Sequence, residues 1–304
     1  MKAVLSTLKF IVVFLFVSLL SNCAHSPKGF NPIHGFTPQA NSQLEAFFKK
    51  TKAETGRKVA VFDGDGTVLG QTPHYLADEC MYMYAKKKPE KKPELLVEMG
   101  KIRNVSMRYV QGRVEYLAGE SVTFLRDMGE KCFNQHYSKK IFEPSRRLIQ
   151  VLKQHGFEVW VVTGSPQVLY QQFLAKQLDI PIINVVGVKS VVRGGIVTGE
   201  MVPPIPQDHG KKEAIETFIQ EQPLFVAGNS RGDKEMIEYS RGLRMIVNPD
   251  EHVAPDQKQS IADYAKSENW LIVRIRDVPE PGFPSISSKA FGIRINKTRD
   301  VKSD

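Results

Sequence analysis

One stretch constrains the fold more than any other, residues 59–67, which read Val-Ala-Val-Phe-Asp-Gly-Asp-Gly-Thr. Four apolar residues run directly into two aspartates, Asp63 and Asp65, and a Gly-Thr turn follows. A short β-branched and aromatic run bounded by turn residues is typical of a buried strand that ends in a loop. In open α/β sheets, ligands bind just beyond the carboxyl ends of the strands. The stretch therefore predicts a buried strand with two carboxylates at its functional end.

Further strands alternate with helices along the rest of the chain. The pattern predicts strands over 158–162, 182–186, 224–227 and 245–247, a hairpin over 191–201, and a helix over 210–220. Ser145 is expected to cap one helix, and Ser165-Pro166 to open the next. Such alternation implies an α/β fold, a Rossmann-like parallel sheet with helices on both faces.

Residues 73–140 interrupt this alternation with a helical, strand-free pattern. A charged turn, Lys86 to Pro93, separates two helices, and Val122, Leu125 and Met128 lie three positions apart on one helical face. We interpret 73–140 as an inserted helical cap on an α/β core formed by 44–72 and 141–278. Residues 279–304 are polar, basic and contain proline, which favours a loose tail.

The first residues have the pattern of an export signal. A short positive region with Lys2 and Lys9 precedes an apolar run over 10–20, which is too short to span a bilayer as a stable helix. The run ends in Leu-Ser-Asn-Cys, which resembles a bacterial lipobox. Asn22 stands where a lipobox usually has Gly, Ala or Ser. We expect a signal peptide over 1–22, lipidation of Cys23 as a membrane anchor, and a tether over 23–43. The alternatives are cleavage near Ala24 or an uncleaved anchor. In each case the body is exported, to the periplasm or cell envelope.

Export changes the interpretation of the cysteines. The chain has three, and Cys80 and Cys132 remain once Cys23 is set aside. Two thiols in an oxidising compartment form a disulfide in many exported proteins. Two buried free thiols are an equally good reading of the sequence.

The charge of the chain gives little support to a nucleic-acid partner. The 304 residues carry a formal net charge of +9, but the excess is spread along the chain. No basic stripe with interleaved aromatic residues is present, so we expect a solvated surface and no nucleic-acid binding.

The predicted strand ends carry groups that suit phosphate chemistry. The first offers Asp63 and Asp65, and the second offers Thr163 at a helix N-terminus, where backbone N–H groups favour an anion. The helix after the hairpin begins with Gly210-Lys211-Lys212, and a later strand ends in a loop that contains Asn229 and Asp233. Carboxylates, a hydroxyl and an ammonium gathered at the carboxyl ends of the strands indicate a site for phosphoryl transfer with a hard cation.

These motifs also carry a resemblance. In this order, the sequences Asp-Gly-Asp-Gly-Thr at 63–67, Val-Thr-Gly-Ser at 162–165, Lys211, and Gly-Asn-Ser-Arg-Gly-Asp at 228–233 resemble the haloacid dehalogenase superfamily of hydrolases. The likeness is to its phosphoserine phosphatase-like branch and covers about 57–250. Any one motif alone is weak, since each also fits a turn, a helix cap or a solvated lysine.

The resemblance implies a role for each matching residue. Asp63 would be the nucleophile that forms an aspartyl-phosphate, and Asp65 would protonate the leaving oxygen and then activate water. These two jobs require different protonation states, so we expect their environments to separate their pKa values. Thr163 and Gly164 would bind the phosphoryl group, and Lys211 would offset charge between nucleophile and phosphate.

The resemblance also implies a Mg²⁺ cofactor. It would be held by the Asp63 carboxylate, the Asp65 backbone carbonyl, and the loop with Asn229 and Asp233. The family often has Asp where this chain has Asn229, and a neutral amide oxygen ligates a hard cation with less charge. The departure bears on metal affinity more than on reaction type.

The predicted function is hydrolysis of small phosphomonoesters, a phosphorylated metabolite being the substrate. Cap residues 73–79 lie nearest the nucleophile and are our candidates for specificity, whereas His74 and His209 lack spaced partners and are expected to be structural or solvated. The alternative is a non-catalytic surface lipoprotein that keeps the fold as a binding module. A phosphotransferase or a carbon–halogen hydrolase is a lesser alternative, and Asp65 with Lys211 and the metal set disfavours halide chemistry.

Overall fold

The structure is a computed structural model that describes residues 29–253, 255 and 257–301. The predicted signal peptide, the Cys23 lipidation site and the first part of the predicted tether lie outside these residues. Within the described part of the chain, every helix is too short or too polar to cross a bilayer.

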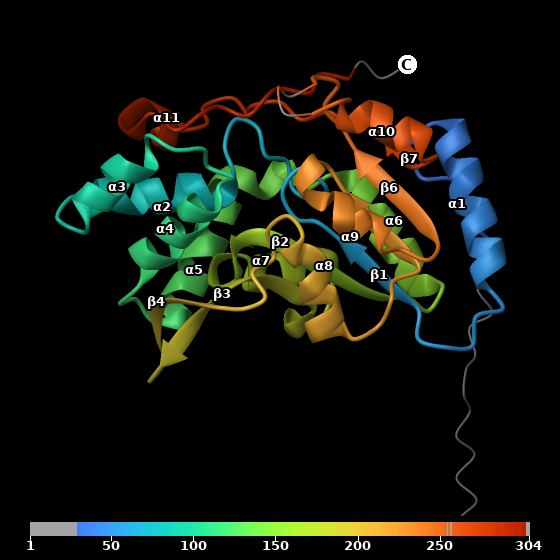
Figure 1. Cartoon of the computed structure of the whole chain (residues 1–304), viewed down its shortest axis with the longest axis horizontal. Coiled ribbons are helices and arrows are strands. Elements are labelled where there is room, and N and C mark those ends of the chain that lie inside the picture. Colours follow the sequence, from blue (N-terminus) through green and yellow to red (C-terminus); the bar gives the residue numbers. More distant parts are fainter. Residues whose placement is uncertain (1–28, 254, 256, 302–304) are drawn as a thin grey trace, which may run out of the picture.

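A seven-stranded sheet in the order β4-β3-β2-β1-β5-β6-β7 forms the centre of the molecule (Figure 1). All neighbouring strands are parallel except β3 and β4, which form the predicted hairpin. The predicted strand at 182–186 begins late, because Ile182–Asn184 forms a 3₁₀ turn. The strands are β1 Val59–Phe62, β2 Glu158–Pro166, β3 Val185–Arg193, β4 Ile196–Val202, β5 Phe225–Gly228, β6 Leu243–Val247 and β7 Leu271–Val273.

Helices cover both faces of this sheet, as predicted. Successive side chains of a strand point to opposite faces, so Ala60 and Phe62 pack into one core and Val59 and Val61 into another. The first core contains side chains of α1 (Pro38–Thr51), α6 (Glu143–Gln154) and α7 (Gln167–Leu178). The second contains side chains of α8 (Gly210–Ala214), its π-helical continuation η4 (Ile215–Ile219), α9 (Lys234–Glu238) and α10 (Ile261–Ser267). The Rossmann-like α/β fold is therefore confirmed.

The tether prediction is wrong for the described residues before 44. Helix α1 begins at Pro38, where Thr37 caps it by accepting a hydrogen bond from the Ala40 N–H. Ile33 is buried, and its N–H donates to the Asn41 side chain at 2.7 Å. The segment is polar in composition, which predicted a tether, but a few of its apolar residues pack onto the core.

Two predicted helix starts are also shifted. Ser145 is not a cap but a buried residue inside α6, where its hydroxyl donates to the Thr67 carbonyl at 2.7 Å. Strand β2 extends through Ser165 to Pro166, so α7 begins at Gln167. In both places a serine that suits a cap is used for a long-range contact instead.

Residues 73–140 fold as helices on one side of the core, on the left in Figure 1. The charged turn at 88–92 separates α2 from α3, and Leu125 is buried on the predicted face of α5. The elements are α2 Leu76–Lys87, α3 Pro93–Met99, α4 Met107–Leu117, α5 Val122–Cys132, the π-helical η1 Phe133–Tyr137 and the 3₁₀ turn η2 Ser138–Lys140.

The loose-tail prediction is wrong for residues 279–301. Helix α11 (Ile286–Phe291) packs against α2, and Figure 1 shows this red segment running from the core to the helical cap and back. The buried Glu79 carboxylate accepts hydrogen bonds from the Ile286 and Ser287 N–H groups and from the Ser287 hydroxyl. Hydrogen bonds to polar groups of the cap hold this segment in place. Its sequence therefore shows no periodic apolar pattern from which its order could be predicted.

Candidate active site

Asp63 lies directly after β1, at the carboxyl edge of the sheet. Its N–H donates to the Ala227 carbonyl of β5 at 2.9 Å and so continues the ladder between these strands. One carboxylate oxygen of Asp63 accepts a hydrogen bond from Lys211 Nζ at 2.6 Å. The same ammonium also forms an ion pair with Asp233. The topology thus brings three predicted residues from distant parts of the chain into one buried cluster.

The charges of this cluster are coupled. Burial raises the pKa of Asp63 to about 7, although the Lys211 ammonium opposes that shift. Burial disfavours the charged form of Lys211, but the two carboxylates outweigh it and raise the pKa of the ammonium above its ordinary value. Burial works against ionised Asp233 as well, but Lys211 and the N–H groups of Asn229 and Ser230 hold the pKa of Asp233 below its ordinary value.

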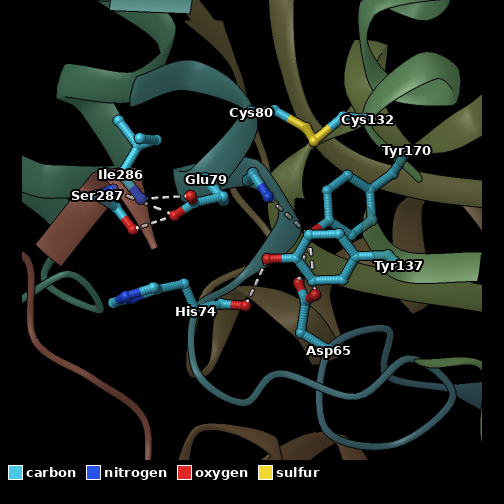
Figure 2. Close-up of a disulfide and its surroundings, with 10 residues drawn as sticks. Asp65, His74, Glu79, Cys80, Cys132, Tyr137, Tyr170, Ile286 and Ser287 are labelled. Atoms are coloured by element: carbon cyan, nitrogen blue, oxygen red, sulfur yellow. Dashed lines mark hydrogen bonds between the residues drawn. A yellow bond between two sulfur atoms is a disulfide. The ribbon is translucent and has the colours of Figure 1, made fainter. Parts of the chain in front are cut away.

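Asp65 has a separate set of partners. Its carboxylate accepts a hydrogen bond from the Ser165 hydroxyl at 2.7 Å. It accepts a second one from the Tyr170 hydroxyl at 2.8 Å (Figure 2). Burial raises the pKa of Asp65 to about 6, and the two hydroxyl donors limit the increase. Burial thus raises the pKa of both aspartates, and the expected separation of their pKa values stays a prediction.

Thr163 and Gly164 line the same cavity from β2. A Cβ atom at Gly64 would lie 3.1 Å from the Thr163 hydroxyl, so a residue without a side chain lets β1 and β2 approach here. A Cβ atom at Gly164 would lie 2.5 Å from the Gln207 side-chain oxygen. The glycines keep space beside Thr163.

Residues with oxygen atoms that suit a hard cation line this cavity, namely Asp63, Asp65 and Asn229. Asp63 keeps one carboxylate oxygen whose nearest described partner is the Thr67 hydroxyl at 3.5 Å. The Asn229 amide lies over Gly66, where a Cβ atom would come within 2.0 Å of it. Carboxylate, amide and backbone carbonyl oxygens are the ligands that Mg²⁺ prefers, so Asp63, Asp65 and Asn229 fit such an ion.

Asp233 is placed differently from these three. It is fully buried, and one of its oxygens accepts from the Asn229 and Ser230 N–H groups at 3.0 and 2.9 Å. Its other oxygen faces Lys211. Asp233 therefore fixes the loop that carries Asn229, and direct coordination by Asp233 stays a prediction.

The cavity bounded by these groups has a volume of about 110 Å³. It includes every predicted catalytic and substrate-binding residue. Its lining residues are Asp63, Asp65, Gln71, Tyr75, Asn104, Val105, Arg113, Thr163, Gly164, Ser165, Gln207, Lys211, Asn229, Ser230 and Gly232.

Sequence reasoning missed several residues of this site, among them Ser165, Tyr170 and Arg113. Tyr170 and Ser165 bind Asp65, and Arg113 of α4 lines the cavity while its Nε donates to the buried Asp78 at 2.9 Å. Ser165 follows the Thr-Gly motif and was open to prediction. Nothing in the local sequence distinguishes Tyr170 or Arg113 from ordinary helix residues.

Of the predicted specificity segment 73–79, the described lining of the cavity includes Tyr75. His74 is buried against Ser288, and its Nε2 lies 3.0 Å from that hydroxyl. His209 is exposed and lies 3.7 Å from Glu213. Both histidines fit the structural or solvated roles that their isolation in the sequence indicates.

Cys80 and Cys132 form a disulfide with a Cα–Cα distance of 5.9 Å, which decides between the two readings of the sequence. It joins α2 to the end of α5. Ala77, one turn earlier in α2, donates its N–H to the Tyr170 hydroxyl at 3.2 Å. The disulfide therefore lies one turn of α2 from a residue that contacts Tyr170, the partner of Asp65, and Figure 2 shows the disulfide and Tyr170 together.

Comparison with known proteins places this site in a family. The chain is 26% identical over 140 residues to phosphoserine phosphatase SerB1 of Mycobacterium tuberculosis, a match that spans 44% of each chain. Two solved structures share the fold, proteins of unknown function from Bordetella pertussis (TM-score 0.57, 15% identity, 72% of this chain and 99% of that one) and from Anaerococcus prevotii (TM-score 0.57, 13% identity, 79% and 95%). The family model of the haloacid dehalogenase-like hydrolases matches residues 60–238, which include every motif described above. The chain belongs to the haloacid dehalogenase-like hydrolases.

Proposed function

We propose that this protein is a Mg²⁺-dependent phosphatase that hydrolyses small phosphomonoesters through an aspartyl-phosphate. One observation carries the proposal: Asp63 contacts the Lys211 ammonium, and Asp65 lies two residues away in the same cavity with its own hydroxyl partners. An anchored nucleophile beside a second, separately held carboxyl group provides both parts of a two-step hydrolysis.

In the first step, an oxygen of Asp63 attacks phosphorus and the bond from phosphorus to the ester oxygen breaks. Asp65 gives its proton to that leaving oxygen. In the second step, Asp65 takes a proton from a water molecule, whose oxygen attacks the aspartyl-phosphate and releases inorganic phosphate. A pKa of about 6 for Asp65 suits a group that both gives and takes a proton near neutral pH.

Thr163, Gly164 and Lys211 bind the phosphoryl oxygens in this proposal. Their donors lie on β2 and α8, two elements fixed to the core, so the site is organised before the substrate arrives. Such preorganised donors stabilise charge that develops in the transition state.

A bound Mg²⁺ would neutralise negative charge on the phosphoryl group. We assign it to the Asp63 carboxylate, the Asp65 backbone carbonyl and Asn229, with Asp233 in direct contact or behind Asn229. Because Asn229 brings no charge, the affinity of this site for the ion is expected to be lower than with an aspartate there.

We also propose that the protein is exported and attached to the membrane through a lipid on Cys23. The apolar run before Cys23 supports this location. The Cys80–Cys132 disulfide is consistent with it, because such bonds persist in oxidising compartments.

The test is phosphate release from p-nitrophenyl phosphate and from phosphoserine, with Mg²⁺ and with a chelator. Turnover that needs Mg²⁺ and is lost in Asp63→Asn supports the enzyme. The matched control is Asp127→Asn, an exposed position of α5 that should keep full activity. A folded protein that turns over no phosphoester would instead support the binding-module alternative.

A further inference from the structure

A second cavity adjoins the catalytic one. Its volume is about 420 Å³, and it shares four lining residues with the catalytic cavity: Gln71, Tyr75, Asn104 and Val105. Small-molecule sites usually occupy about 300–1,000 Å³, so the catalytic cavity of about 110 Å³ is small for a whole substrate. A bound phosphomonoester therefore needs further room, and the shared residues show where that room begins.

The second cavity is strongly basic, and we call it the basic cavity. Its lining contains five cationic side chains and one carboxylate, Asp250. Asp250 forms ion pairs with two of the cations, Lys297 at 3.1 Å and Arg299 at 3.9 Å. The other three, Lys101, Arg103 and Arg294, form no ion pair with any residue that the structure describes.

Two separate segments supply the cations of the basic cavity. Lys101 and Arg103 belong to the loop between α3 and α4 of the cap, and Arg294 and Lys297 belong to the C-terminal segment after α11. These segments approach closely, since a Cβ atom at Gly100 would lie 2.8 Å from the Phe291 carbonyl. Unpaired cations from two segments repel one another. An anion bound between them would reduce this electrostatic repulsion.

The C-terminal wall of the basic cavity, residues 292–299, is fixed in place beside the catalytic cavity. The Asn296 N–H donates to the Pro73 carbonyl at 2.8 Å, and its side-chain amide donates to the Gln71 carbonyl at 2.7 Å. The Thr72 hydroxyl donates to the Lys297 carbonyl at 3.0 Å. The wall is therefore attached to the very residues that lead from Asp63 into the cap. It lies outside residues 60–238, which match the family model.

We propose that the substrate is a phosphomonoester whose leaving group carries a second anionic group, and that the basic cavity binds this second group. The inference rests on the proposed phosphatase activity and narrows its substrate class. The phosphoryl group to be cleaved occupies the catalytic cavity, and the body of the substrate passes Asn104 and Val105. The distal anion meets Arg103 from the cap and Arg294 from the C-terminal segment.

The test compares three alkyl phosphates of equal chain length: one with an uncharged end, one with a terminal carboxylate and one with a second phosphate. For the native protein at low ionic strength, we expect kcat/KM for the bisphosphate to exceed that for the uncharged ester by about tenfold, after correction for its two equivalent ends. The carboxylate should fall between them, because it carries less charge. Added salt should reduce the preference, since exposed charges are screened.

The variant Arg103→Gln/Arg294→Gln should lose most of this preference through a higher KM for the bisphosphate. Both residues are exposed, so the fold should persist, and turnover of the uncharged ester should stay unchanged. The control is Arg147→Gln, an exposed arginine of α6 away from both cavities, which should keep the preference.

Three results would overturn the inference. One is equal kcat/KM for all three esters, and another is a preference that survives the double variant. The third is an equal loss on the uncharged ester, which would indicate a general defect. If no ester is turned over at all, the phosphatase proposal itself fails, and the substrate class falls with it.

Discussion

The core side of the cavity and its cap side hold their charged groups in different ways. On the core side, formed by the strand ends, Asp63, Lys211 and Asp233 are buried and paired with one another. On the cap side, formed by α2–α5 and the C-terminal segment 279–301, Arg103 and Arg294 are exposed and line the basic cavity. Buried charges must be satisfied within the protein, whereas exposed charges remain available to a ligand. The difference indicates that the paired groups of the core side carry out the reaction, and that the exposed cations of the cap side select the substrate.

The two sides share an apolar core but differ in the bonds that supplement it. Parallel strands and two apolar cores fix the core side, and the first of these cores continues into the cap, where Leu76, Tyr109 and Leu125 are buried in it. The cap side adds individual bonds: the Cys80–Cys132 disulfide, the Glu79 carboxylate and the contacts of Asn296. Single substitutions should therefore affect catalysis when they fall on the core side, and substrate contacts or local order when they fall on the cap side.

The largest expected effect is that of Lys211→Met. It leaves two buried carboxylates without their shared cation, which should lower the free energy of unfolding by about 3–5 kcal/mol. Turnover of p-nitrophenyl phosphate should also be lost. Chemical denaturation followed by circular dichroism measures the first effect. Lys212→Met is the matched control, since Lys212 lies on the outside of the same helix, 3.5 Å from Glu216. Equal effects of the two variants would contradict the special role of the core cluster.

Loss of the disulfide should come next. Cys80 and Cys132 are 52 positions apart, and a cross-link that closes a loop of this length contributes about 2–4 kcal/mol to the free energy of unfolding. Cys80→Ala/Cys132→Ala should lower the denaturation midpoint by a corresponding amount, and reductant should do the same to the native protein. The double variant should not respond to reductant. An unchanged midpoint would show that the cap side is stable without the bridge.

Glu79→Gln should have a smaller and more local effect. Its carboxylate accepts three hydrogen bonds from α11, and replacing the charge should cost about 1–3 kcal/mol of stability at this contact. Hydrogen exchange of the amides at 283–293 should become faster, while the β1 amides keep their protection. Glu94→Gln, at an exposed position of α3, is the control. Unchanged exchange at α11 would mean that other contacts hold the segment.

The smallest expected effect is that of Tyr170→Phe, which removes one hydroxyl that orients Asp65. Turnover of an alkyl phosphate should fall by up to about tenfold, which corresponds to the loss of one hydrogen bond. Turnover of p-nitrophenyl phosphate should fall less, since its leaving group needs little help from an acid. Tyr264→Phe, on α10, is the control. An equal decrease on both substrates would indicate a general loss of structure rather than misplacement of the acid.

Much of the core side could be predicted from the sequence because its signals are local. The apolar run at 59–62 and the aspartates after it fixed one strand end, and the alternation of elements predicted the parallel sheet. Parallel strands bring their carboxyl ends to one edge, so Thr163, Lys211 and Asn229 were expected near Asp63. The shifts at Ser145 and Ser165 arose because a cap signal cannot reveal a long-range partner such as the Thr67 carbonyl.

The helices of the cap were predicted, but most contacts of the cap side were not, because they join residues far apart in the chain. Glu79 and Ser287 read as ordinary polar residues until α11 is placed on α2. Tyr170 has no local feature that distinguishes it, and the cysteine pair was compatible with two states. The polar segments before 44 and after 279 lacked periodic apolar residues, so composition favoured disorder where individual hydrogen bonds and a few buried side chains impose order.

By itself, the sequence determined the α/β core and the identity of the groups at its strand ends, because strand period and turn chemistry act over a few residues. Only the tertiary structure decided which groups pair, that Asp65 is held by Ser165 and Tyr170, and that cap and C-terminal cations share one cavity. Pairing and cavity formation depend on distance in space. That distance is set when the cap and the C-terminal segment pack against the core.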